Sequence, residues 1–380
     1  MKQSLLFLFL IALISCSTSE KQGQDFTTII QNLPPSENII DFEEYFKVTD
    51  IISLETNDSS IIDFVHEVLI DDYLFIKGGG AVYKFDRKGT FISKIEKEVD
   101  GQNAFKNLTD VILLPQQKRI WIYDSNKRNI LQFDYDLNFE VNYKLGFPLF
   151  GIEKLNESLL GTPGYMMSID KPHSLIKFSG DNLATGYSVK ESYLPFNIEK
   201  SKYLHINRDD YFSYTERDGF NFVNSFNDSI YYIDQSGVPK VEYYIDFEDK
   251  KVLEEDLTDR GYSTIVDVFT FINSTNKSFN VGNIFQSKMY LVYRFFNSGI
   301  PYLSVYKKND GSLVSAKKVR FNFYDTEVIV DLDEEMRIGS LGDGIGYISF
   351  PLDGGILSSL KEFDYLDKLS NPIIILFNEK

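Results

Sequence analysis

The residues that could bind a metal or transfer a proton are sparse in this sequence. His66, His173 and His205 lie far apart, and none has another histidine or a cysteine two or four positions away. The densest acidic run, at 331–335, lacks the fixed ligand offsets and central glycine of an EF-hand loop. We interpret this run, and the acidic pairs at 71–72 and 209–210, as solvated turns. The sequence therefore predicts no bound metal and no cofactor.

Nucleophilic catalysis has no support in the sequence either. There is no Gly-x-Ser-x-Gly elbow and no Ser-x-x-Lys with its usual companions. The glycine triplet at 78–80 precedes a predicted strand and lacks the Lys-Ser/Thr of a phosphate-binding loop, so we interpret it as a tight turn. These absences favour a protein that binds a ligand over one that catalyses a reaction.

The charge balance excludes one class of partner. The chain has 39 basic and 56 acidic residues, which gives a net charge of −17. A nucleic acid must be met by clustered Lys and Arg, so we predict no nucleic-acid partner. A hydrophobic content of 43% is enough for a folded core.

The only cysteine, Cys16, follows an apolar run at 5–14 that begins shortly after Lys2. The run is shorter than the ~20 residues that span a membrane and has the form of a secretory signal. Its end, Leu-Ile-Ser-Cys, resembles the lipobox of bacterial lipoproteins, in which the cysteine is acylated and becomes the mature N-terminus. The resemblance implies a signal peptide at 1–15, palmitate on Cys16 and a location in the cell envelope, anchored to a membrane that we expect to be the outer one. A free thiol after an ordinary cleaved signal is the alternative.

A recurring hairpin organises the rest of the chain. In each copy an apolar residue ends a strand, a short polar turn with Gly or Asn follows, and a second strand returns. The apolar markers are spaced by 48, 45, 55 and 73 residues, at Phe85, Phe133, Phe178, Ile233 and Tyr306. A period in the forties is typical of a four-stranded propeller blade. A sixth blade is expected from strands at 344–350 and 372–377.

The fold predicted from this spacing is all-β: a six-bladed β-propeller of four-stranded antiparallel blades. Its ring would be closed by pairing the N-terminal strand at 46–54 with the C-terminal blade, which lacks an outer strand. Residues 16–45 are expected to be the lipidated N-terminus and a flexible tether, and residues 46–380 the propeller. An insertion at about 249–278 accounts for the longest gap, with a short helix near 254–256 and a strand at 266–272. Apolar residues at three-residue spacing predict an amphipathic helix at 360–369.

The segments at 51–57, 61–76 and 82–89 resemble the six-bladed β-propeller lipoproteins of Bacteroidetes, which are similar to NHL-repeat and TolB-like propellers. The resemblance covers about residues 45–378. Of the glycine-rich loop that often follows the first blade in that family, only Gly101 and Gln102 are present. The resemblance implies the fold and the envelope location more than an activity.

The candidate ligand-binding residues follow from this fold. His66, Glu67 and Asp110 lie near the starts of innermost strands, where they would face the central channel. Arg294 shares a strand face with Val292 and Phe296, and a cation on so apolar a face needs a partner or a ligand.

The function that we expect is a lipid-anchored, extracytoplasmic module that binds a ligand or a protein and has no catalytic activity. Its partners would be the membrane, through the lipid anchor, and a protein or glycan ligand. Two alternatives remain open. One is a metal-dependent propeller hydrolase or lyase that resembles lactonases, and the other is a glycan-capture lipoprotein of a polysaccharide-uptake system.

Overall fold

The computed structural model describes residues 26–97, 104–165, 172–182, 186–201, 208, 210–258, 260–323, 326–333, 335–351 and 370–380. The predicted signal peptide, the anchor residue Cys16, the loop residues Gly101 and Gln102, His205 and the predicted helix at 360–369 lie outside these residues. Where the chain is described, it is mostly β-strand, as the sequence predicted.

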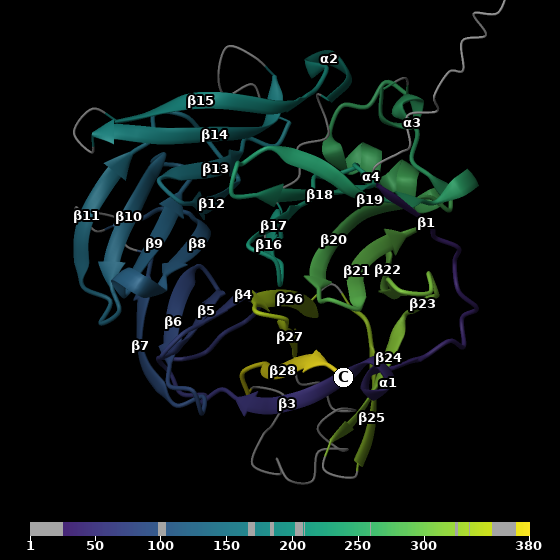
Figure 1. Cartoon of the computed structure of the whole chain (residues 1–380), viewed down its shortest axis with the longest axis horizontal. Helices are drawn as coiled ribbons and strands as arrows, with labels where there is room; N and C mark the ends of the chain where they lie inside the picture. Colours follow the sequence, from purple (N-terminus) through teal and green to yellow (C-terminus); the bar gives the residue numbers. More distant parts are fainter. Residues whose placement is uncertain are drawn as a thin grey trace, which may run out of the picture.

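The strands form a radial β-propeller arrangement of antiparallel sheets. Figure 1 shows the sheets placed around a central axis. The first two consist of β4 (Val65–Ile70), β5 (Leu74–Gly78), β6 (Ala81–Phe85) and β7 (Phe91–Glu96), and of β8 (Leu108–Leu114), β9 (Arg119–Asp124), β10 (Asn129–Asp134) and β11 (Phe139–Lys144). The next two consist of β12 (Gly151–Leu155), β13 (Ser158–Thr162), β14 (His173–Asn182) and β15 (Gly186–Pro195), and of β16 (Phe212–Tyr214), β17 (Gly219–Phe222), β18 (Ser229–Asp234) and β19 (Pro239–Asp246). Two further sheets consist of β20 (Ser278–Gln286), β21 (Tyr290–Asn297), β22 (Ile300–Lys307) and β23 (Leu313–Ala316), and of β26 (Arg337–Gly342), β27 (Ile345–Phe350), β28 (Ile373–Glu379) and β3 (Phe46–Ser53).

The predicted hairpin is the turn between the third and fourth strands of a sheet. The marker Phe85 ends β6 and is fully buried. The Asp86 carboxylate then accepts hydrogen bonds from the backbone N–H groups of Lys88 and Thr90, which fixes the turn. Gly89 adopts a φ of 89°, and a Cβ there would lie 2.2 Å from the carbonyl oxygen of Ser53. Gly89 is thus required in this turn for both its positive φ and the lack of space for a side chain.

The N-terminal strand β3 pairs antiparallel with β28, with Ile51 opposite Ile375. Phe46, at the start of β3, is fully buried against the rings of Phe285 and Phe377. Apolar burial of these rings therefore stabilises a contact between segments more than 300 positions apart in the sequence.

Part of the segment expected to be a tether belongs to the fold. Residues 27–30 form β1 (Thr27–Ile30), which pairs parallel with β19. β2 (Ile40–Asp41) joins β24 (Lys318–Phe323) and β25 (Thr326–Asp331) in a three-stranded sheet that the sequence reasoning missed, and α1 (Phe42–Tyr45) follows. Ile29, Ile40 and Phe42 are buried, so the free energy of apolar burial holds residues 27–45 to the propeller.

The predicted strand at 266–272 is wrong. The insertion contains two helices, α3 (Glu254–Thr258) and α4 (Ile265–Ser274). Thr264 and Asp267 form a reciprocal capping box, and Val268 and Ile272 are buried at a four-residue spacing. The β-branched residues favoured a strand, but capping and helical burial decided the structure. The last sheet also begins earlier than predicted, because β26 precedes the strand expected at 344–350. Shorter elements are α2 (Ile198–Ser201) and the 3₁₀ turns η1 (Pro115–Gln117) and η2 (Glu248–Lys250).

Candidate functional site

Three cavities lie in series along the innermost strands β4, β8, β12, β16, β20 and β26. The first, which we call the arginine mouth, is a cavity of about 640 Å³ where β4, β16, β20 and β26 begin. The second is a small channel cavity, and the third, the apolar mouth, is a cavity of about 580 Å³ near the ends of β4, β8, β12, β16 and β26. Arg208 lines both the arginine mouth and the channel cavity, and Glu153 lines both the channel cavity and the apolar mouth.

An ion pair between Arg208 and Asp210 forms the floor of the arginine mouth. Arg208 Nε and Nη2 donate to the two carboxylate oxygens of Asp210 at 2.9 and 3.0 Å, and Nη2 also donates to the carbonyl oxygen of Val281 at 2.9 Å. Asn283 adds two donors, its backbone N–H at 2.6 Å and its Nδ2 at 2.8 Å. The arrangement fixes both side chains in one orientation.

The pair is pressed against the backbone of β20. A Cβ on Gly282 would lie 1.9 Å from Arg208 Nη2 and 2.2 Å from Asp210 Oδ2, so this position requires glycine. Burial would raise the pKa of Asp210, but the charge and hydrogen bonds of Arg208 outweigh it and lower that pKa to about 2. The pair is therefore ionised at neutral pH. The sequence interpretation of 209–210 as a solvated turn is wrong for Asp210.

Two more arginines line the same mouth. The guanidinium carbon of Arg337 lies 4.2 Å from the centroid of the Phe64 ring. Arg294 is buried, and its guanidinium donates to the carbonyl oxygens of Met336 and, at 2.7 Å, of Asp333. Its predicted need for a partner is thus met by backbone oxygens just before β26. Arg294 also lines the cavity, so the structure places this predicted candidate at the arginine mouth.

The other predicted channel residues lie close to this mouth. Glu67 and Asp110 line the channel cavity together with Arg208. Asp110 Oδ2 accepts a hydrogen bond from the backbone N–H of Ile152 at 2.8 Å, and Oδ1 lies 3.8 Å from Nζ of the buried Lys77. The ring of His66 contacts the Phe64 ring edge-on at 4.6 Å between centroids. Sequence reasoning missed Arg208, Asp210, Arg337 and Glu153, because their convergence depends on contacts between sheets.

The apolar mouth holds a carboxyl group in a different environment. Its lining includes Leu69, Leu113, Leu114 and Phe220 around Glu153. Burial, with a smaller contribution from the Asp110 charge, raises the pKa of Glu153 to about 8. The Glu153 carboxyl is therefore largely protonated at neutral pH, unlike Asp210.

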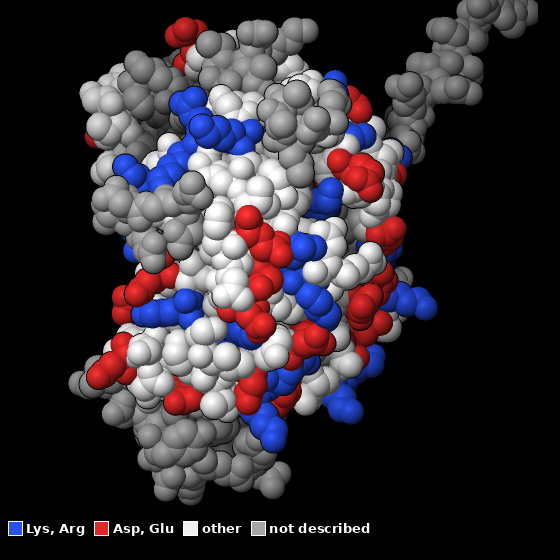
Figure 2. Space-filling model, turned by 90° about the vertical axis from the view of Figure 1, so that its left-hand side faces the viewer, with Lys and Arg blue, Asp and Glu red and all other residues white. Residues whose placement is uncertain are grey.

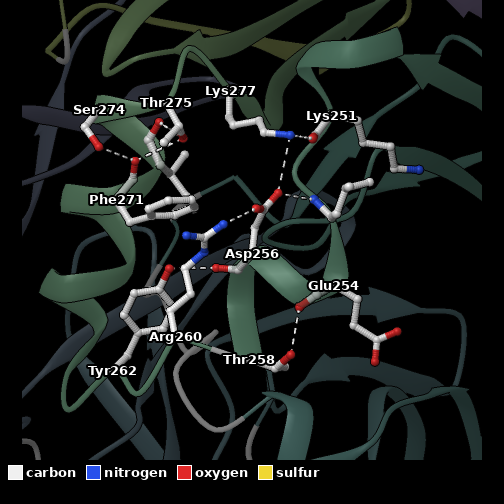
Figure 3. A network of polar contacts seen from close by, with 12 residues as sticks. Lys251, Glu254, Asp256, Thr258, Arg260, Tyr262, Phe271, Ser274, Thr275 and Lys277 are labelled. Carbon is white, nitrogen blue, oxygen red and sulfur yellow. Dashed lines mark hydrogen bonds and ion pairs between the residues drawn. The ribbon is translucent and has the colours of Figure 1, made fainter.

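The insertion covers the arginine mouth through α4, which contributes Phe269 and Asn273 to the cavity lining. Figure 3 shows the polar network that holds the insertion. Buried Asp256 accepts a hydrogen bond from the Leu253 N–H at 2.9 Å and lies 3.4 Å from Nζ of Lys277. Lys277 immediately precedes β20 and also donates to the carbonyl oxygen of Lys251 at 2.8 Å. Asp256 thus ties the covering helices to the strand that carries the Arg208 contact.

Two kinds of feature are absent from the described residues, namely clusters of metal-ligating side chains and helices that could cross a membrane. None of these residues form a group of three or more His, Cys, Asp or Glu side chains able to hold a metal ion. No helix in the described part of the chain is long and apolar enough to cross a membrane.

The charged side chains at the surface are mixed in sign. On the side shown in Figure 2, acidic and basic side chains are interspersed rather than gathered into a patch of one sign. Asp71 lies in the bend between β4 and β5, where a turn was predicted, and it accepts hydrogen bonds from Lys118 and Tyr135, each at 2.8 Å. The Lys118 hydrogen bond is the main cause that lowers the pKa of Asp71.

A family model, described as a domain of unknown function (DUF4934), matches residues 27–377. The chain belongs to this family. The match starts at the first residue of β1, which agrees with the earlier start of the fold found in the structure. A search of curated proteins found no match.

Solved structures similar to this DUF4934 chain include two from Bacteroides. A presumed exported protein of Bacteroides fragilis has a TM-score of 0.69 and 14% identity, covering 93% of this chain and 99% of that one. A member of the DUF4221 family from Bacteroides vulgatus has a TM-score of 0.52 and 12% identity, covering 88% and 98%. At these identities the likeness concerns the fold alone.

The arginine mouth of this DUF4934 protein brings together three kinds of side chain. It combines fixed cations, amide groups and the partly exposed rings of Phe64, Phe269 and Phe296. These groups can pair with a charge, exchange hydrogen bonds and cover an apolar surface.

Proposed function

We propose that this protein is a lipid-anchored, extracytoplasmic binding module on a six-bladed propeller and that it catalyses no reaction. The four-stranded sheets and the β3–β28 pairing support six blades and closure of the ring by the N-terminal strand. The fold shared with a presumed exported Bacteroides protein supports a location outside the cytoplasm.

The arginine mouth is the proposed ligand site, and its make-up is the observation that carries the proposal. Three arginines from separate segments converge on one cavity of about 640 Å³, together with phenylalanine rings and asparagine amides. A concave site with a few convergent polar groups is the arrangement that binding pockets use. Three of the four predicted candidates line this mouth or the channel cavity behind it, namely Arg294, Glu67 and Asp110.

The test compares two substitutions on exposed positions of α4. Asn273 lines the arginine mouth, whereas Val266 is 65% exposed and does not line it. The full-length chain, solubilised in detergent, is applied to an array of neutral and acidic glycans. We expect saturable binding to at least one glycan, which Asn273→Trp lowers about tenfold by filling the mouth and Val266→Trp leaves unchanged. Equal binding by both variants would show that the ligand site lies elsewhere.

The lipid anchor is tested separately at Cys16. Acyl chains contribute ~0.8 kcal/mol for each CH₂ group buried in the bilayer, so their loss should release the protein. We expect Cys16→Ala to move the protein from the membrane to the soluble fraction on centrifugation. Retention of the variant on membranes would contradict the anchor.

The metal-dependent hydrolase or lyase alternative makes an opposite prediction for the purified full-length protein. It requires a cation held by the channel carboxylates, including Glu67 and Asp110. We expect elemental analysis to find no stoichiometric Ca²⁺ or Zn²⁺. One metal ion per chain, with turnover lost in Glu67→Gln, would favour the enzyme.

A further inference from the structure

The basic residues that line the arginine mouth are arginines rather than lysines. Lysines outnumber arginines in the chain, yet three of its nine arginines line this cavity, and no lysine is among its described lining residues. A guanidinium is planar, keeps its charge when buried and presents donors in a fixed fork that fits a carboxylate, whereas an ammonium is a point charge. This composition therefore favours a planar anionic group over a neutral ligand.

Arg208 retains one donor that none of the described residues uses. The residue is only 9% exposed, its Nε and Nη2 are held by Asp210 and Val281, and its buried Nη1 has no hydrogen-bond partner among the described residues. Leaving a donor of a buried cation unsatisfied is costly. An oxygen of a ligand in the adjoining cavity would satisfy it after a small adjustment of the surrounding side chains.

The charges around the mouth limit the charge of the ligand. Asp210 is saturated by donors from Arg208 and Asn283, and the exposed carboxylates of Asp63 and Glu335 also line the cavity. A dianion such as phosphate would be repelled by these carboxylates more strongly than a monoanion. Behind Arg208, the channel cavity is lined by Glu67 and Asp110, which disfavour deeper entry of an anion. A single carboxylate held near Arg208 fits this distribution best.

The remaining lining fits a saccharide ring. Phe64, Phe269 and Phe296 expose ring surface, on which the C–H face of a sugar can pack. Asn280 uses its Oδ1 to accept the N–H of Phe226 at 3.2 Å, and Asn273 is exposed at the rim. Amide groups both donate and accept, as recognition of hydroxyl groups requires.

We propose that the arginine mouth binds an acidic sugar, free or at the end of a glycan, through one carboxylate near Arg208 and a ring face against the phenylalanines. The inference rests on the proposed binding function and adds the class of ligand.

The test uses D-glucuronate and D-glucose as probes, because they share a ring and differ by the carboxylate. Binding to the full-length protein in detergent is followed by ligand-detected NMR titration, with acetate and inorganic phosphate as further probes. We expect glucuronate to bind at least about tenfold more tightly than glucose, acetate or phosphate, and its affinity to fall as salt rises.

A matched pair of arginine variants locates the site. Arg337 lies on the Phe64 ring in the mouth, and Arg217 lies in the same way on the Tyr232 ring, 3.9 Å from its centroid, outside the mouth. Arg337→Gln should weaken glucuronate binding about tenfold and Arg217→Gln should not change it. Because Arg337 is half-buried and glutamine keeps hydrogen-bond donors at this position, the variant should remain folded, which circular dichroism would check.

Three results would overturn the inference: equal binding of glucose and glucuronate, preference for phosphate, or no binding of glucuronate. If, in one of these cases, Asn273→Trp still lowers the binding of a neutral glycan on the array, the proposed binding function stands. Only the inference of an acidic sugar is then wrong. If Asn273→Trp blocks no ligand, the binding site itself has been placed wrongly.

Discussion

The two mouths of the channel are similar in volume but differ in how they hold charge. At the arginine mouth Asp210 is ionised, because Arg208 and Asn283 supply four donors to its carboxylate. At the apolar mouth burial raises the pKa of Glu153 to about 8, and leucine side chains line the cavity around it. The insertion covers only the arginine mouth, through α4.

The difference shows how one repeated architecture produces two unlike ends. The innermost strands β4, β16 and β26 line the arginine mouth at or just before their starts and the apolar mouth near their ends. β8 and β12 contribute to the apolar mouth, and β20 contributes to the arginine mouth. The charged groups of the arginine mouth come largely from residues just before strands, such as Arg208 and Asp210, or at a strand start, such as Arg337. We therefore expect the ligand-binding residues in the segments that precede the innermost strands, because loops vary while the strands hold them in place.

The largest expected effect is at the ion pair of the arginine mouth. Asp210→Ala leaves Arg208 buried without its carboxylate, and removal of one partner of a buried pair destabilises by about 3–5 kcal/mol. Urea denaturation followed by circular dichroism measures the free energy of unfolding. The matched control is Asp63→Ala, which removes an exposed carboxylate from the same mouth and should change stability by less than about 0.5 kcal/mol.

The same measurement compares the two ends directly. Leu113→Ala at the apolar mouth removes apolar contacts from a residue beside an existing cavity, with an expected loss of about 2–3 kcal/mol. A smaller loss for Asp210→Ala than for Leu113→Ala would show that the ion pair is not what holds the arginine mouth together.

The next effect is a pH dependence of the free energy of unfolding, caused by Glu153 at the apolar mouth. The pKa of Glu153 rises from 4.5 to about 8 on folding, so between these values the folded chain keeps a proton that the unfolded chain releases. This contribution to stability is complete below pH 4.5 and is lost as the pH rises towards 8. We expect the loss to be about 2–4 kcal/mol between about pH 5 and about pH 8.

Glu153→Gln should flatten that part of the stability curve, because glutamine does not titrate. Asp228, whose pKa burial raises to about 7, titrates in the same window, so Asp228→Asn serves as the comparison variant. Denaturation curves at several pH values measure both contributions. An unchanged slope in Glu153→Gln would mean that its carboxyl is ionised in the folded protein and that the two mouths are more alike than the structure indicates.

The repeated hairpin could be predicted from the sequence because the residues that define it are close together in the chain. The marker residues, such as Phe85 and Ile233, and the turns that follow them depend on neighbours within a few positions. The insertion was harder to predict, since 266–272 is rich in residues that favour strands, and only the Thr264–Asp267 capping box pointed to a helix.

The candidate site could be predicted only in part. Glu67 and Asp110 follow from strand order alone, because the innermost strands face the channel. Asp210 resembles a solvated turn in the sequence, and its partner Arg208 packs against Gly282 of another sheet. Contacts between sheets thus decide which charged residues converge, and no local pattern records them.

The smallest expected effect would sharpen the assignment of the ligand to one mouth. Gln116 is exposed and lines the apolar mouth, much as Asn273 is exposed and lines the arginine mouth. If an acidic sugar binds near Arg208, Gln116→Trp should leave the glucuronate affinity within about twofold of the unsubstituted protein, since an exposed substitution away from a site changes little. The NMR titration used for Arg337→Gln measures this for Gln116→Trp and Asn273→Trp alike. A loss in Gln116→Trp as large as that in Asn273→Trp would mean that a ligand reaches Glu153 from the strand ends, and the channel would then have to be treated as one continuous site.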